Sequence, residues 1–284
     1  MKSVLITGGS GAFGNAMTQY LLTETNVDRI VIYSRGEYRQ FQMAQEVAPL
    51  NMADRLRFMI GDVRDRDRLR RAMEGIEVVI HAAALKRIEV GNYNPIEMVK
   101  TNVGGAINVI EAAQDAGVRK VVALSSDKAF QPVSPYGASK ALAESIFLAA
   151  NNTTGFRGPK FSVCRYGNVW GSTGSVVPIW RGMVTQGIDT VPVTDPECTR
   201  FFMRMSEAVD LVINTINSSI VGELAIPKLP AYRIGDLASA MGLDIRVTGL
   251  PPWEKKHEAM NEELWSNEAR RMTIAELTRE LQNG

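Results

Sequence analysis

Thr7-Gly8-Gly9-Ser10-Gly11-Ala12-Phe13-Gly14 is the stretch that decides the fold. It follows an apolar run at residues 4–7 and precedes a helical pattern at residues 16–25, so it joins a strand to a helix. The glycines at 8, 11 and 14 let the backbone approach a pyrophosphate at the helix N-terminus, where free N–H groups and the helix dipole attract an anion. The motif predicts a dinucleotide site, and a tight turn that binds nothing is the alternative.

Strand and helix patterns alternate through the first half of the chain. Further β-branched runs, mostly apolar on both faces, occur at residues 30–34, 56–60, 78–81 and 120–125. Helical spacing occurs at residues 66–73, 95–116 and 136–151. Gly117 follows the second of these helices, at a position that favours a left-handed residue. The alternation predicts an α/β fold, with a doubly wound parallel sheet and helices on both of its faces.

The pattern changes near Tyr166, where stretches rich in Gly, Pro, Thr and Ser begin to separate shorter helical pieces at residues 206–218 and 233–241. We therefore predict a dinucleotide-binding core over residues 1–166, to which later segments return. Residues 167–284 are expected to form mainly a small α/β substrate-binding cap over the sheet, and not a second independent domain.

Composition excludes several classes of protein. The chain of 284 residues has a formal net charge of +1 with both signs interspersed, so we predict a small-molecule partner and neither nucleic-acid nor membrane binding. Its first apolar run is too short for a signal peptide or a membrane span, and we expect a cytoplasmic protein. Cys164 and Cys198 lack metal-type spacing; two reduced thiols are expected, with a disulfide as the alternative, and no metal site is predicted.

The end of the second strand indicates which dinucleotide binds. An acidic residue there would bind the ribose 2′-hydroxyl of NAD, whereas this chain has Ser34 and Arg35. A hydroxyl and a guanidinium suit a 2′-phosphate, so NADP is predicted over NAD, unless Arg35 is an ordinary solvated residue. Asp62 and Val63, after the third strand, are candidates to hold the adenine edge, although Asp62 also fits a plain turn.

Tyr136 and Lys140, in Tyr136-Gly137-Ala138-Ser139-Lys140, lie one helical turn apart on the same face. A tyrosine is a poor base at neutral pH, but a nearby ammonium and the cationic ring of an oxidised nicotinamide favour the phenolate. The pair then removes a proton from a substrate hydroxyl. The alternative is an amphipathic helix with a Tyr and a Lys on its solvated side.

These motifs, together with His81-Ala82-Ala83-Ala84, resemble the extended short-chain dehydrogenase/reductase family over nearly the whole chain. Within it, the sequence is most similar to the inverting UDP-N-acetylglucosamine 4,6-dehydratases. That similarity lies in Tyr33-Ser34-Arg35, Ile60-Gly61-Asp62-Val63-Arg64-Asp65, Ala84-Leu85-Lys86, Tyr93-Asn94-Pro95, Arg165-Tyr166-Gly167-Asn168-Val169 and Gly174-Ser175-Val176-Val177-Pro178.

The motifs and the resemblance together predict the binding residues. The cofactor is expected to contact Thr7, Gly8, Ser10, Gly11, Ala12, Phe13, Gly14, Ser34, Arg35, Asp62, Val63, Ala82, Ala83, Ala84, Lys86, Asn102, Tyr136, Lys140, Tyr166, Asn168 and Val169. A nucleotide-diphosphate sugar is expected to contact Lys86, Asn168, Ser175, Val176, Arg200 and Glu258. The resemblance implies that Arg200 pairs with phosphate and Glu258 with ribose. His81 is expected to be structural, and His257 is either a surface residue or a ligand.

Ser125-Ser126-Asp127-Lys128, directly after the fifth strand, separates the reactions of this family. Loss of water from C5 and C6 of a 4-keto sugar needs an acid for the hydroxyl and a base for the C5 proton, and Asp127 and Lys128 supply both. The resemblance implies that Tyr136 takes the 4-hydroxyl proton, Ser126 hydrogen-bonds the oxygen, and a hydride passes from C4 to the nicotinamide and back to C6. Lys128 acts as the base if it is neutral. Related 4,6-dehydratases carry Asp-Glu here, and the family pattern associates Lys with inversion. A solvated Asp-Lys ion pair is the alternative.

The chain departs from the family at several points. Pro251-Pro252-Trp253-Glu254-Lys255 replaces the usual Arg-Pro-Gly-Glu-Lys, so an arginine that contacts the diphosphate or the nucleotide is missing, and Lys255 or Lys256 are possible substitutes. Arg87 stands where the family pattern has His, and the chain ends earlier than many members. A 4-epimerase, a 5,6-dehydratase and a non-catalytic dinucleotide-sensing regulator remain alternatives. The helices at residues 95–116 and 136–151 either pair two copies into a dimer or larger ring, or belong to the core.

Overall fold

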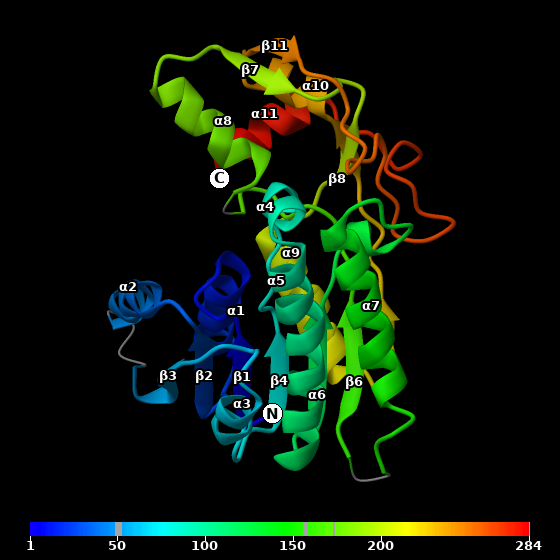
Figure 1. Cartoon of the computed structure of the whole chain (residues 1–284). Coiled ribbons are helices and arrows are strands. Elements are labelled where there is room, and N and C mark those ends of the chain that lie inside the picture. The colour runs from blue at the N-terminus through cyan, green and yellow to red at the C-terminus, as the bar shows by residue number, and fades with distance from the viewer. Residues whose placement is uncertain (49–52, 156–157, 173, 284) are drawn as a thin grey trace.

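The computed structural model describes residues 1–48, 53–155, 158–172 and 174–283. Within them, a seven-stranded parallel sheet has the order β3-β2-β1-β4-β5-β6-β9 (Figure 1). The strands are β1 (Ser3–Thr7), β2 (Arg29–Ser34), β3 (Leu56–Ile60), β4 (Val78–His81), β5 (Lys120–Leu124), β6 (Lys160–Cys164) and β9 (Leu224–Ala225). The predicted doubly wound parallel sheet is confirmed, and the five predicted strands lie within a residue of their expected bounds.

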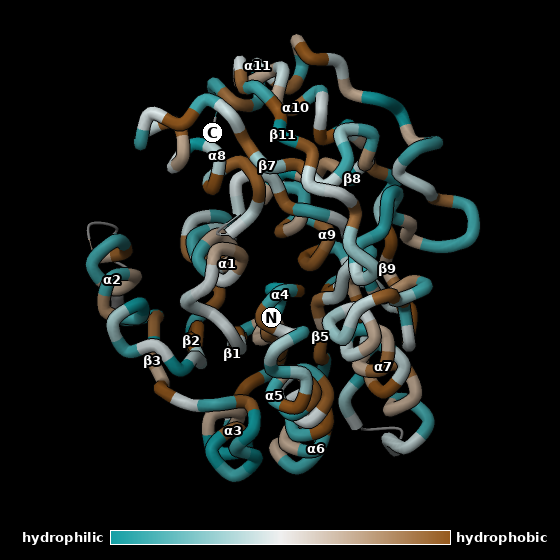
Figure 2. Tube along the Cα trace, turned by 45° about the horizontal axis from the view of Figure 1, so that its top comes forward, coloured by the Kyte–Doolittle hydropathy of each residue, from teal (hydrophilic) through white to brown (hydrophobic). Residues whose placement is uncertain are grey.

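Helices cover both faces of this sheet. One face packs against α1 (Ala12–Thr23), α2 (Glu37–Val47) and α9 (Met205–Asn217), through side chains such as Met17, Met43 and Val212. The other packs against α3 (Arg66–Ala72), α6 (Gly105–Asp115) and α7 (Pro135–Ala150), through Leu69, Val109 and Phe147. Both sets are almost fully buried, which explains why the central strands are apolar on both faces. The alternation of apolar and polar segments along α6 and α7 is visible in Figure 2.

The strand order reverses between β1 and β4, because β1 pairs with β2 on one side and with β4 on the other. In open parallel sheets, the crevice outside the carboxyl ends of the strands at such a point is where ligands bind. The glycine turn follows β1, and His81-Ala82-Ala83 begins at the last residue of β4. One motif therefore lies on each side of the crevice.

Two predicted helices differ from the structure. The first begins at Ala12 and ends at Thr23, not at residues 16–25, because the last glycine of the turn already belongs to the helix. The helix expected at residues 95–116 is divided into α5 (Pro95–Val99), a π-helical segment (Lys100–Gly104) and α6. Gly117 has the predicted left-handed backbone, with φ +68°.

The C-terminal part covers the carboxyl edge of the sheet (Figure 1). Its elements are α8 (Val176–Thr185), β7 (Thr190–Val193), β8 (Thr199–Phe201), β10 (Ala231–Arg233), α10 (Ile234–Ala240), β11 (Asp244–Val247) and α11 (Ile274–Asn283). They have a hydrophobic cluster of their own that includes Trp180, Phe202 and Leu277. β9 and α9 come from the same half of the chain but pack on the central sheet.

Cys164 and Cys198 are both buried free cysteines, as expected for reduced thiols. Among the described residues, no helix combines the length and the apolar character needed to cross a lipid bilayer.

Candidate active site

A cavity of about 1190 Å³ lies between the carboxyl edge of the sheet and the cap. Pockets for one small ligand are usually about 300–1,000 Å³, so this volume accommodates a dinucleotide together with part of a second ligand. Its lining includes the glycine turn, Ser34, Arg35, Lys128, Tyr136, Lys140, Arg200 and Glu258. Residues predicted from five separate motifs therefore surround one space. Of the predicted site residues, Thr7, Asn102 and Asp127 are not part of its lining.

The glycine turn is shaped for close approach of a ligand to the backbone. Gly8 has φ +67°, and a Cβ added there would lie 2.9 Å from the backbone of Ala83, so no side chain fits. Its N–H donates to the Tyr33 carbonyl (2.8 Å), which fixes the turn against β2. Gly11, the N-cap of α1, makes no side-chain capping bond, so the first N–H groups of the helix face the cavity without a side-chain cap. The cradle fits a pyrophosphate.

The end of β2 is held by a network of polar side chains. The hydroxyls of Ser10 and Ser34 share a hydrogen bond (2.8 Å), and the Gln40 amide donates to the Ser34 hydroxyl (2.9 Å) and to the Met59 carbonyl (3.1 Å). The sequence analysis did not single out Gln40, because a buried glutamine on an amphipathic helix has no motif. The network leaves the Ser34 side chain at the cavity wall.

Asp62 is paired with two arginines. Its carboxylate lies 2.7 Å from Arg64 and 3.8 Å from Arg35. Burial alone would raise the pKa of Asp62, but the hydrogen bonds and charge of Arg64, with the charge of Arg35, leave it below its ordinary value. The side chain of Arg35 is 57% exposed, so it is available to an anion at the cavity rim.

The segment after β5 forms a short 3-10 turn, Asp127–Ala129, against the start of α7. A Cβ on Gly137 would lie 2.3 Å from the Lys128 carbonyl oxygen, so the helix and the turn meet this closely only because position 137 has no side chain. Ser134 caps α7, its hydroxyl accepting from the Gly137 N–H (3.2 Å). This contact places Tyr136 beside Ser126 and Lys128.

Tyr136 and Lys140 are both buried at the cavity wall. Burial raises the pKa of Tyr136, while the charge of Lys128 and a hydrogen bond with Ser126 oppose that rise. Lys128 therefore supplies the favourable charge on the phenol that we predicted for Lys140. Lys140 donates to the Leu124 carbonyl (2.5 Å), and burial lowers its pKa to about 8 against the opposing charge of Glu144. Because its pKa stays above the ordinary value, Tyr136 is held as a neutral phenol near pH 7.

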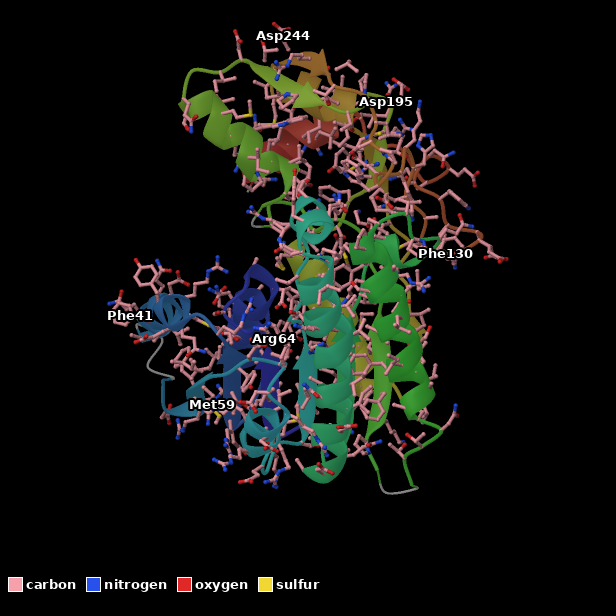
Figure 3. The ribbon with its side chains drawn as sticks, in the orientation of Figure 1. Phe41, Met59, Arg64, Phe130, Asp195 and Asp244 are labelled. Atoms are coloured by element: carbon pink, nitrogen blue, oxygen red, sulfur yellow. The ribbon has the colours of Figure 1, made fainter. Side chains whose placement is uncertain are left out.

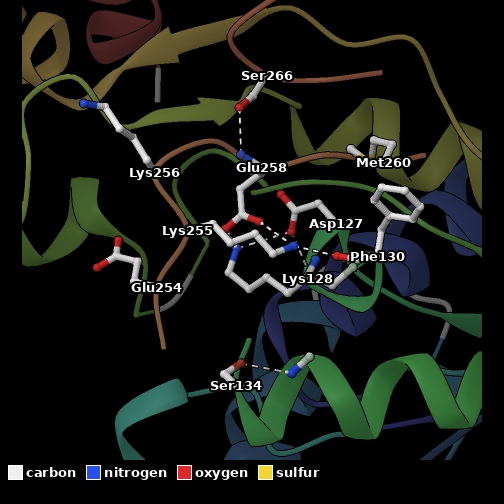
Figure 4. A network of polar contacts seen from close by, with 12 residues as sticks. Asp127, Lys128, Phe130, Ser134, Glu254, Lys255, Lys256, Glu258, Met260 and Ser266 are labelled. Carbon is white, nitrogen blue, oxygen red and sulfur yellow. Dashed lines mark hydrogen bonds and ion pairs between the residues drawn. The ribbon is translucent and has the colours of Figure 1, made fainter. Parts of the chain in front are cut away.

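Lys128 lies between two buried carboxylates (Figure 4). Its Nζ is 3.3 Å from Asp127 Oδ1 and 2.9 Å from Glu258 Oε1, and both carboxylates are 1% exposed. Burial would lower the pKa of Lys128, but the charges of the two carboxylates raise it above the ordinary value. The raised pKa favours the ammonium form of Lys128 in this arrangement, so its role as a neutral base stays a prediction. Sequence alone did not reveal Glu258 as its partner.

The two carboxylates differ in protonation. Burial and the neighbouring Glu258 charge raise the pKa of Asp127, although Lys128 opposes this. For Glu258, burial is outweighed by the charges of Lys128 and Arg200, and its pKa is lowered. Like charges held close push two pKa values apart, so Asp127 is the more readily protonated carboxyl of the pair and Glu258 the more readily ionised one. Asp127 Oδ2 has no hydrogen-bond partner among the described residues and lies behind Gly167, which lines the cavity.

On the cap side, Arg200 is already engaged. Its guanidinium donates to Glu254 (2.5 Å) and to the carbonyls of Thr199 (2.8 Å) and Lys256 (3.1 Å). Glu258, expected at a ribose, contacts Lys128. Lys255, a possible substitute for the missing arginine, lines the cavity, and its Nζ donates to the Phe130 carbonyl (2.6 Å). Figure 3 shows Phe130 where the loop after β5 meets the cap.

Two predicted residues support the cavity from behind. Asn102, in the π-helical segment, accepts from the Leu85 N–H (2.8 Å) and donates to the Leu85 carbonyl (2.9 Å) and the Ser139 hydroxyl (3.0 Å). It therefore fixes the strand end that carries Lys86. Thr7 Oγ1 bonds His81 Nδ1 (2.8 Å) and accepts from the Ala83 N–H (3.3 Å). Both side chains position cavity residues and do not line the cavity.

Other residues of the lining were not predicted as site residues. Arg39, Glu89, Trp180 and Thr194 had no sequence signal, whereas Arg87, Trp253 and Glu254 stood out only as departures from the family pattern. Arg87 lies beside Gly174, where an added Cβ would be 3.2 Å from its guanidinium. The two histidines have different partners: His81 is buried with Thr7, and His257 shares a hydrogen bond with Thr199 Oγ1 (2.8 Å), half-buried in the cap.

The fold and the site define an extended short-chain dehydrogenase/reductase. A family described as polysaccharide biosynthesis protein matches residues 4–277. An inverting UDP-N-acetylglucosamine 4,6-dehydratase from Campylobacter jejuni is 44% identical over 261 residues, or 91% of this chain and 77% of that protein. A UDP-glucose 4-epimerase from Rickettsia conorii is 38% identical over 268 residues, with coverage of 91% and 77%. The chain therefore belongs to this polysaccharide biosynthesis family.

Solved structures share the architecture. The X-ray structure of Pen from Bacillus thuringiensis has a TM-score of 0.93 at 33% identity, covering 100% of this chain and 98% of that chain. A dTDP-glucose 4,6-dehydratase from Streptomyces venezuelae, crystallised with NAD and TYD bound, has a TM-score of 0.82 at 21% identity, covering 99% and 96%.

His81 makes the stability of the protein sensitive to acid. Burial lowers its pKa from 6.5 to about 3, with a contribution from Lys140, so as the pH falls from 6.5 to 3 the unfolded chain binds a proton that the folded chain refuses. We expect this group to lower the free energy of unfolding by up to about 1.4 kcal/mol per pH unit in that window. Urea unfolding of wild type and His81→Asn between pH 7 and 4 measures it. Equal slopes for the two proteins would contradict the assignment.

Proposed function

We propose that the chain is a nucleotide-sugar 4,6-dehydratase that acts on UDP-N-acetylglucosamine, with inversion at C5. The observation that carries this proposal is the acid Asp127 and the cation Lys128 held in one buried cluster beside Tyr136. A redox step at C4 needs only Tyr136, Lys140 and Ser126, so the additional acid and amine fit a loss of water. The identity to the Campylobacter enzyme supports the same reading.

The residues divide the proton transfers among them. Tyr136, as phenolate, accepts the 4-hydroxyl proton while Ser126 hydrogen-bonds the oxygen. Bound NADP would supply a hydride acceptor and donor for C4 and C6. Asp127, whose pKa is raised by burial, protonates the departing 6-hydroxyl. Lys128 removes the proton from C5 and returns one to the opposite face. The cap excludes water from the reacting sugar.

We expect conversion of UDP-N-acetylglucosamine to a 4-keto-6-deoxy sugar without net reduction of the cofactor. In deuterated water, proton NMR should show one deuterium at C5 with the coupling constants of the inverted product. Tyr136→Phe should reduce turnover by about 10²–10⁴-fold, because it removes the proton acceptor. Glu197→Gln, an exposed cap residue paired with Arg233, is the control and should behave as wild type.

Each alternative reaction gives a distinct outcome. A C4 epimer without loss of water would support the epimerase named among the relatives. Reduction of one cofactor per sugar would indicate a simple dehydrogenase, and the position of the new double bond would identify a 5,6-dehydratase. Cofactor binding without turnover of any nucleotide sugar would indicate a dinucleotide sensor.

The proposed cofactor is NADP. Ser34 and the exposed Arg35 stand at the end of β2 with Arg39 at the cavity wall, and the nearest carboxylate, Asp62, is already paired with Arg64. The Streptomyces protein was crystallised with NAD, so the test of this proposal must compare the binding of NADP with that of NAD.

Arg35→Ala should weaken NADP binding by about tenfold, the loss of one guanidinium–phosphate contact, and change NAD binding by less than threefold. Calorimetric titration of both dinucleotides on wild type and variant gives the two ratios. A wild type that binds NAD more tightly than NADP would overturn the proposal.

The diphosphate of the sugar nucleotide is proposed to bind near Lys86 and Arg87. Neither side chain takes part in an ion pair with any described residue, and both line the cavity opposite the N-terminus of α8. Ser175, the N-cap of that helix, has a buried hydroxyl without a hydrogen-bond partner in the described part of the chain. Two cations without an ion-pair partner, a helix N-terminus and a hydroxyl without a hydrogen-bond partner suit an anion. The guanidinium of Arg87 can bind a phosphate through two parallel hydrogen bonds, which the family's arginine would do at the position of Pro251.

Self-association is proposed through the surface formed by α4 (Ile88–Tyr93), α5, α6 and α7. Tyr93, Ile96, Val99, Ile107 and Leu142 are 89%, 65%, 48%, 40% and 51% exposed there. We expect light scattering to give at least twice the monomer mass of 31.2 kDa, and Ile96→Glu to shift the protein to monomer. A monomeric wild type would contradict this.

A further inference from the structure

The structure raises a difficulty for the proposed chemistry. A base for the C5 proton must have a free electron pair, whereas Lys128 is an ammonium in the resting site. Its proton must therefore leave before Lys128 can act. Two carboxylates contact its Nζ, and Glu258 is both the closer one, at 2.9 Å against 3.3 Å for Asp127, and the one whose pKa is lowered.

We propose that Glu258 is a positioning residue for the elimination: it holds Lys128 Nζ against Asp127 and takes the ammonium proton, so that Lys128 can accept the proton from C5. The inference rests on the proposed function. It departs from the ribose contact that the family resemblance implies for this position. Its basis is the 2.9 Å contact between Lys128 Nζ and Glu258 Oε1, with Glu258 1% exposed.

The geometry favours Lys128 as the proton donor to Glu258. The backbone N–H of Glu258 donates to Ser266 Oγ (2.9 Å), which fixes the start of the side chain. Oε2 has no hydrogen bond among the described residues and forms a longer ion pair with Lys255, at 3.6 Å. Lys255 is itself anchored to the Phe130 carbonyl. The 2.9 Å contact between Oε1 and Lys128 Nζ is therefore the shortest path by which a proton reaches Glu258.

The proton transfer balances. An N–H bond of Lys128 breaks and an O–H bond of Glu258 forms, which turns an ion pair into a neutral amine and a neutral acid. The amine then forms a new N–H bond with the C5 proton, while the electrons of the C5–H bond form the C5–C6 double bond. The C6–O bond breaks and Asp127 supplies the proton that releases water. Binding of a sugar that expels water from the cavity favours the neutral pair, because desolvation penalises both charges.

The test separates this role from ribose binding. In Glu258→Gln, wild-type-like binding of the nucleotide sugar with a kcat for water elimination lowered at least 100-fold is expected. The residual rate should rise with pH, since only solvent can then deprotonate Lys128. Glu258→Ala should recover activity with added formate, and Glu258→Asp should retain part of it. A raised KM with unchanged kcat would instead establish a substrate contact and overturn the proposal.

A second measurement does not depend on turnover. Lysine labelled with ¹³C at Cε reports the titration of Lys128, assigned by its loss in Lys128→Met. Replacing Glu258 by Gln should shift that titration to lower pH, because the carboxylate charge nearest to the ammonium is gone. The same signal in Glu197→Gln should not move. An unchanged titration in Glu258→Gln would overturn the inference even if the enzyme proves to catalyse another reaction, whereas inactivity of wild type would count against the proposed function only.

Discussion

A buried ion pair between Lys128 and Glu258 joins the catalytic turn after β5 to the cap. The cap segment at residues 254–258 contains no helix or strand, and backbone hydrogen bonds from Thr199 to Lys256 (3.0 Å) and from Ser266 to Glu258 (2.8 Å) hold it within the cap. Towards the sheet, Lys255 donates to the Phe130 carbonyl beside the turn after β5. Together with the Lys128–Glu258 ion pair, this bond ties the cap segment to the catalytic turn.

Burial of this cluster is costly unless the charges are balanced. Each ion moved out of water costs several kcal/mol. The attraction between the partners offsets this cost only when their geometry is good and the numbers of positive and negative charges match. Lys128 lies between the two carboxylates, and Arg200 and Lys255 add positive charge near Glu258. These charges lower the pKa of Glu258, while burial raises the pKa of Asp127. The same balance that permits burial provides a proton donor in a water-poor site.

The sheet, the glycine turn and the Tyr136–Lys140 pair could be predicted because each is encoded locally, by apolar periodicity, by backbone freedom or by helical spacing. The π-helical segment at residues 100–104 could not, because local spacing does not show that Asn102 within it bonds to Leu85. The partner of Lys128 was also out of reach. Periodicity gives no information about which two loops meet, and a single Glu in a coil segment has no pattern of its own.

The identity of residue 128 explains why the cap must supply an acid here. An Asp-Glu sequence at this turn would place two acids side by side, and a third buried carboxylate at 258 would then repel both. A lysine reverses that requirement, because a buried ammonium beside a neutral Asp127 needs an anion within contact distance. Glu258 meets it at 2.9 Å. The two residues are therefore best understood as one unit, in which the lysine makes the buried glutamate tolerable and the glutamate decides when the lysine carries its proton.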